Sequence, residues 1–132
     1  MTKNKDVKML KVALLSFAVV VFFYGFVLLF IPGMFVTVSG SQPVYFGWIR
    51  WIGGILISLG IGSLLVFRDP TNQGIFVTTI SLGTLLAGLG ILYSWLMHEY
   101  SGATWFFTLP AIVVLAVSVF LWWSRQQAKE IL

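Results

Sequence analysis

The chain alternates long apolar stretches with short polar segments. Each apolar stretch carries at most one charged residue, which lies near its N-terminal end. As a helix, each stretch is about long enough to cross a hydrocarbon core of ~30 Å. We therefore predict four membrane-spanning helices, at about 9–31, 45–67, 74–97 and 103–123.

The segments between these stretches carry the residues that end helices and form turns. Pro32 and Gly33 end the first helix, because proline lacks a backbone donor and glycine adopts conformations that other residues resist. The polar stretches at 39–43, 68–73 and 98–102 are typical of turns. The apolar part of the first connection, at 34–38, is predicted to lie along the membrane interface.

Composition supports a membrane protein rather than a soluble domain. Hydrophobic residues make up 59% of the chain and charged residues only 9%, whereas soluble domains are about 25% charged. The connections leave no room for a separate soluble domain. We therefore predict one all-α transmembrane domain over 1–132, a four-helix bundle with antiparallel, up-down neighbours. The absence of cysteine excludes disulfides and thiolate sites.

The basic residues indicate orientation. The N-terminal lysines, Arg68, Arg125 and Lys129 fall on one side of a four-span chain, and Arg50 alone falls on the other. Because positive residues favour the cytoplasmic side, both termini are predicted to be cytoplasmic, in a plasma or inner membrane. The net charge of +4 therefore reflects topology rather than nucleic-acid binding. The first apolar stretch is longer than the core of a signal peptide, so we interpret it as a retained span.

The second and third predicted helices carry small residues at helical spacing. In lipid, small residues let helix backbones approach closely. A slot for a lipid tail or a quinone beside a thin helix surface is the alternative that this spacing leaves open. Our main interpretation is a tight contact between the two helices, formed by Gly53, Gly54, Ser58 and Gly62 on one side and Gly83, Ala87, Gly90 and Ser94 on the other.

Three polar residues near the predicted outer surface are candidates for an ion pair or a binding site. Arg50 lies about 7 Å inside the second span, so it needs a partner for its charge. Glu99, at the outer end of the third span, is the predicted partner; an anionic group of a lipid or ligand is the alternative. His98 is the only histidine. It is more typical of an interface residue than of a metal ligand, so no metal or cofactor is predicted.

The second helix also carries a local pattern of charge and glycine. Arg50 is followed by several glycines, and the helix ends at Phe67-Arg68-Asp69-Pro70. Together with the first helix ending at Ile31-Pro32-Gly33, this pattern resembles the small four-helix membrane proteins of the DoxX-like kind and related families of unknown function. The resemblance implies a four-helix membrane fold and marks Arg50 as a position of interest. Some members of that group are associated with quinone-linked redox enzymes.

The residues favour a binding or structural role over catalysis. No predicted span has a carboxylate in its interior, which argues against proton-coupled transport and intramembrane hydrolysis. We therefore predict a non-enzymatic accessory or assembly subunit of a larger membrane complex. Its predicted partners are membrane lipid, other membrane subunits or a second copy of the chain. The alternative is a lipid, quinone or small-molecule carrier with an outer-leaflet site for an anionic group near Arg50.

Overall fold

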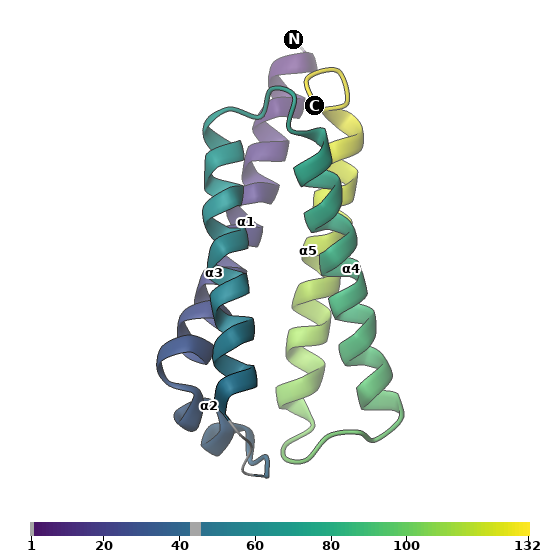
Figure 1. The fold of residues 1–132 in the computed structure, drawn as a ribbon. Helices are drawn as coiled ribbons and strands as arrows, with labels where there is room; N and C mark the ends of the chain where they lie inside the picture. The colour runs from purple at the N-terminus through teal and green to yellow at the C-terminus, as the bar shows by residue number, and fades with distance from the viewer. Residues whose placement is uncertain (1, 43–45) are drawn as a thin grey trace.

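The computed structural model describes residues 2–42 and 46–132. Four of the helices in this part of the chain are long and apolar enough to cross a membrane, as the hydropathy pattern predicts. A fifth, shorter helix follows the first of them. The helices are α1 (Thr2–Phe30), α2 (Pro32–Ser39), α3 (Phe46–Arg68), α4 (Gly74–Leu96) and α5 (Trp105–Gln127) (Figure 1).

The helix bounds differ from the predicted spans mainly at the two ends of the chain. α1 begins at Thr2 rather than near residue 9, because lysine is a good helix former and nothing before residue 9 stops a helix. α5 likewise continues past residue 123 to Gln127, because arginine and glutamine are also good helix formers. The predicted start of the second span, residue 45, lies outside the described residues.

The short helix α2 occupies the apolar segment that was expected at the membrane interface. Pro32 stands at its start, where the missing N–H is not needed and the fixed φ suits a helix. The helix ends at Gly40, which has φ of 69° and donates its N–H to the carbonyl of Thr37. A left-handed residue of this kind is a common helix stop, and glycine adopts it without steric cost.

The four long helices pack as two pairs. α3 packs along α1, and α4 packs along α5; α1 also contacts α5 (Figure 1). Figure 1 shows both chain ends at the end of the bundle where the turn between α3 and α4 lies. The fully buried core residues gather near that end, because they come from the first half of α1, the start of α4 and the last turns of α5: Leu10, Leu14, Val77 and Leu121.

Glycines set the close approach within each pair. A Cβ added at Gly53 of α3 would lie 2.7 Å from the backbone nitrogen of Leu29 in α1. A Cβ at Gly60 would lie 2.9 Å from the ring of Phe22. In the other pair, a Cβ at Gly88 of α4 would lie 2.6 Å from the side chain of Leu115. A larger side chain at Gly53 would require a shift of the α1 backbone, whereas at Gly60 or Gly88 the facing side chain would have to move.

Each pair is also joined by a buried serine. The hydroxyl of Ser63 in α3 donates to the carbonyl of Leu14 in α1, at 2.9 Å. The hydroxyl of Ser118 in α5 donates to the carbonyl of Ser81 in α4, at 3.1 Å. Serines in membrane helices usually bond to their own helix, so these two bonds between helices add directional contacts to the pairs.

Backbone contacts join the residues after α5 to the turn between α3 and α4 and to the start of α4. The N–H of Asn72, in the turn between α3 and α4, donates to the carbonyl of Ile131 at 2.9 Å. The N–H of Gly74 donates to the carbonyl of Leu132 at 3.1 Å. Within the turn, the Asp69 carboxylate accepts the N–H of Thr71, as expected for a residue that caps a turn. Hydrogen bonds from the side chain and from the backbone N–H of Thr71 lower the pKa of Asp69 below its usual 3.8.

The loops at the opposite end are joined as well. The N–H of Ala103 donates to the carbonyl of Ser39 at 2.9 Å, and the hydroxyl of Ser41 donates to the carbonyl of Ser101 at 3.0 Å. Gly102 lies between these contacts with φ of 100°, and a Cβ there would lie 2.2 Å from the Ser39 carbonyl oxygen. Only glycine fits this crossing of the two loops.

Candidate functional site

A cavity of about 430 Å³ lies between the two helix pairs. The surface that faces it is entirely apolar. The hydroxyls of Thr79 and Thr84 donate to carbonyls of their own helix, so they offer no polar group to the cavity. All four long helices contribute to its wall, through Phe17, Val20, Val21, Tyr24, Leu28, Ile52, Leu56, Leu59, Thr79, Ile80, Gly83, Thr84, Ala87, Ile91, Pro110, Val114 and Val117.

The cavity exists because α3 and α4 diverge with increasing distance from the turn that joins them (Figure 1). Near the turn they touch: a Cβ at Gly62 would lie 2.7 Å from the ring of Phe76. Farther along, α4 presents Gly83 and Ala87 to the space between the pairs. A Cβ at Gly83 would meet no atom within 4 Å. Small side chains on a helix face that no other helix approaches closely leave a hollow.

The shape of the cavity suits a long, narrow, apolar molecule. Its wall follows α4 from Thr79 to Ile91, a distance of about 18 Å at 1.5 Å per residue. Its volume lies within the usual range for small-molecule pockets, about 300 to 1,000 Å³. With no polar surface, it offers no general acid, base or metal ligand. It can bind a hydrocarbon chain by dispersion contacts, and it can exclude water.

Arg50 lies outside this cavity and contacts the end of α1. Its Nη1 donates to the carbonyl of Leu29, in the last turn of α1. Carbonyls of a last helical turn lack donors from their own helix, and a basic side chain beside them also interacts favourably with the helix dipole. The partner of Arg50 is therefore a backbone carbonyl of the neighbouring helix rather than a carboxylate.

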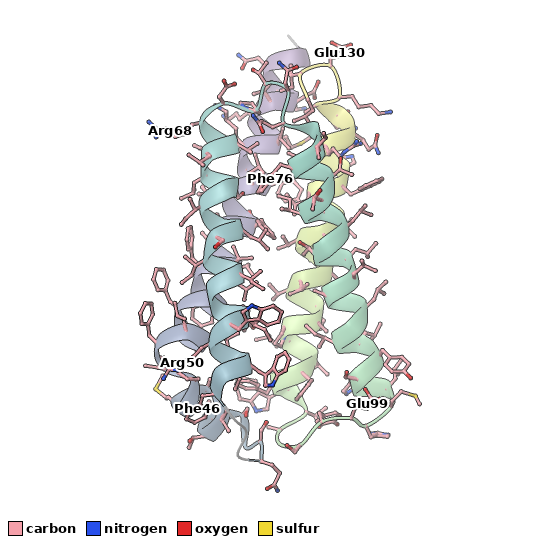
Figure 2. All side chains as sticks on the ribbon, in the orientation of Figure 1. Phe46, Arg50, Arg68, Phe76, Glu99 and Glu130 are labelled. Atoms are coloured by element: carbon pink, nitrogen blue, oxygen red, sulfur yellow. The ribbon has the colours of Figure 1, made fainter. Side chains whose placement is uncertain are left out.

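Glu99 and His98 occupy an exposed turn after α4. The Glu99 carboxylate accepts the hydroxyl of Ser94 at 3.3 Å. His98 has φ of 53°, and its ring centre lies 6.4 Å from that of Tyr100. Figure 2 shows Arg50 and Glu99 on opposite sides of the bundle, so the predicted pair does not form. The described residues include no group of three or more His, Cys, Asp or Glu that could bind a metal.

The small residues predicted to join the second and third spans are divided among several environments. Gly53 packs on α1, and only Gly62 meets α4. The hydroxyl of Ser58 donates to its own helix, at the carbonyl of Gly54. A Cβ at Gly54 or Gly90 would meet no atom within 4 Å. Spacing identified thin helix surfaces but not their partners, and α3 packs on α1, which is not its neighbour across the short turn.

A second feature, which the sequence did not predict, lies near the chain termini. The Arg125 Nε donates to the Thr78 hydroxyl at 2.7 Å, which joins α5 to α4. The Arg125 guanidinium also lies 5.4 Å from the centre of the Trp122 ring. From the sequence, Arg125 and Lys129 were interpreted only as indicators of the orientation in the membrane. A tryptophan three residues before an arginine was the available signal, because that spacing puts both on one helix face.

Comparisons of the chain with models of known families, with curated proteins and with solved structures found no match. The resemblance to DoxX-like proteins therefore stays a prediction from the residues quoted above.

Proposed function

We propose that this chain is a four-span integral membrane protein that binds a hydrocarbon chain, from a lipid or a quinone, between its two helix pairs. The observation that carries the proposal is the apolar cavity of about 430 Å³. Atoms that line such a space lack dispersion partners on one side. A bound chain would supply those contacts, and it would stabilise the folded protein because it binds only the folded state.

The chemistry of the cavity favours binding over catalysis. A reaction would need polar groups aimed at the reacting atoms, whereas the wall here is apolar. The proposed ligand site is the cavity and not the region near Arg50 that the sequence suggested. The Arg50 guanidinium bonds to the carbonyl of Leu29 and lies outside the cavity wall. Arg50 then has a structural role, and the ligand is recognised by the shape and length of its apolar part.

We also propose that the bundle has up-down topology with both termini in the cytoplasm. The supporting observations are the excess of basic residues at that end and the position of both termini beside the α3–α4 turn (Figure 1). The chain has no cysteine, so single cysteines can report the orientation. Cysteines at Ser41 or Ser101 should react with an impermeant thiol reagent from outside, and cysteines at Asn72 or Gln127 should not.

The binding proposal predicts that the purified protein retains an apolar ligand. In mild detergent, mass spectrometry of an organic extract should find a lipid or quinone bound near one per chain. Gly83→Leu adds an isobutyl group at the cavity wall, so it should reduce retention several-fold. Gly90→Leu is the matched control: it makes the same change in the same helix, also where a Cβ meets no atom within 4 Å, but outside the cavity wall.

Two results would count against this function. Equal retention by the two leucine variants would place the ligand outside the cavity. Co-purification of another membrane subunit in constant proportion, with no retained lipid or quinone, would instead favour the accessory-subunit role predicted from the sequence.

A further inference from the structure

A groove of about 410 Å³ lies where α4 begins and α5 ends. Its wall contains two basic side chains, Arg125 and Lys129, and no acidic one. Two acidic side chains, Asp6 and Glu130, line a neighbouring hollow that Lys129 also borders. The groove therefore combines two positively charged side chains with no acidic side chain in its wall.

Arg125 is held in place from two sides. Its Nε donates to Thr78 at 2.7 Å, and the guanidinium packs against the Trp122 ring. Because Nε makes this bond, the two terminal nitrogens of the guanidinium remain available to a ligand. They have no partner in the part of the chain that the structure describes. A guanidinium that is fixed in this way is prepared to donate two parallel hydrogen bonds to a phosphate.

The start of α4 adds to the positive potential. The first N–H groups of a helix lack acceptors from their own helix, and the helix dipole is positive there. The N–H of Gly74 is satisfied by the carbonyl of Leu132. Ile75, the next residue, lines the groove. The helix start thus supports the two basic side chains, which remain the main recognition groups.

The position of the groove identifies the kind of anion. Arg125 lies in the last turn of a candidate span, and Gly74 begins another, so the groove lies where a span meets the headgroup region. Trp122 and Trp123, both exposed, mark the same level. Thr79 lines both the groove and the apolar cavity. A molecule that bears both a phosphate and hydrocarbon chains would match a basic groove that borders an apolar cavity.

We propose that the groove binds the phosphate of an anionic phospholipid, from the leaflet on the side of the chain termini. Arg125 donates to the phosphate oxygens and Lys129 supplies a second positive charge. The acyl chains run along α4 from Ile75 towards Thr79. This site does not depend on a ligand in the cavity, so it stands or fails separately from the proposed function.

The test compares lipids and matched variants by thermal unfolding in a nonionic detergent. Wild-type protein titrated with dioleoyl phosphatidylglycerol should show saturable stabilisation, with about tenfold tighter apparent binding than dioleoyl phosphatidylcholine. Arg125→Gln combined with Lys129→Gln should abolish this preference. The control, Arg68→Gln combined with Lys8→Gln, removes the same charge from exposed positions at the same end and should keep it.

Arg125→Gln also removes the bond to Thr78, so Lys129→Gln alone provides a variant that keeps this bond. It should weaken phosphatidylglycerol binding several-fold without lowering the unfolding midpoint of the lipid-free protein. Equal losses in the groove and control variants would show general charge attraction and overturn the site. Stabilisation by inorganic phosphate as strong as that by phosphatidylglycerol would overturn the assignment to a lipid. Retention of lipid preference in the double groove variant would place the anion elsewhere.

Discussion

The contacts within the helix pairs differ from the space between the pairs. Within the α1/α3 pair, a Cβ at Gly25 or Gly53 would overlap atoms of the partner helix, and Ser63 bonds across the contact. Between the pairs, Gly83 has open space beside it and the wall is apolar throughout. Both regions contain glycine, but only the first uses it for close packing.

This difference shows what a row of small residues can and cannot predict. A glycine thins one face of a helix, and a neighbour that approaches the thin face gains dispersion contacts. Without such a neighbour, the thin face leaves a hollow. Gly53 and Gly54 are adjacent in sequence, yet only Gly53 faces α1 closely. The partner helix therefore decides whether a small residue stabilises the fold or leaves room for a ligand.

The largest expected effect is a contrast between these two neighbouring glycines. Gly53→Leu should destabilise the protein by about 3 kcal/mol, because its side chain would displace backbone atoms of α1. Gly54→Leu should change stability little, since a Cβ there meets no atom within 4 Å. Unfolding of both variants by titration with a denaturing detergent checks the contrast. Similar losses at both positions would mean that the pairs are not packed as described.

The fold was largely predictable from the sequence, because hydrophobic length and turn residues are local signals. The four spans follow from uninterrupted apolar stretches, and Pro32 correctly marks the end of α1. The helix α2 was not predicted, since a segment of eight residues has little periodicity of its own. The pairing of α3 with α1 was also missed, because spacing does not specify which helix meets a thin face.

The candidate sites were harder to predict, since they depend on contacts between distant parts of the chain. Arg50 was expected to pair with Glu99, but it bonds to the carbonyl of Leu29, and backbone acceptors leave no trace in side-chain composition. Arg125 and Thr78 are separated by 47 positions, so their bond could not be inferred from local spacing. The cavity, likewise, arises from the divergence of α3 and α4.

A smaller effect is expected at the end of the α1/α3 pair opposite the chain termini. Arg50→Ala removes the donor to the last turn of α1, so it should cost about 1 to 2 kcal/mol at this exposed position. Glu99→Gln should have little effect, and the double variant should equal the sum of the two single changes. Arg68→Ala, in the polar turn, is the control. A coupling between Arg50 and Glu99 in this double-mutant cycle would contradict the carbonyl contact.

The smallest expected effect concerns the serines of α3, and it separates bonds between helices from bonds within one helix. Ser63→Ala removes the hydroxyl that bonds to Leu14 of α1, and hydrogen bonds between membrane helices contribute about 0.6 kcal/mol on average. Ser58→Ala removes a hydroxyl that bonds only to its own helix, at the carbonyl of Gly54. The carbonyl of Gly54 keeps its helical donor, so that change should be close to neutral. Both variants can be compared by the same detergent titration, with replicates fine enough to resolve a few tenths of a kcal/mol. A loss at Ser58 equal to that at Ser63 would show that the Ser63 bond adds nothing specific to the α1/α3 contact, and glycine packing alone would then account for the pair.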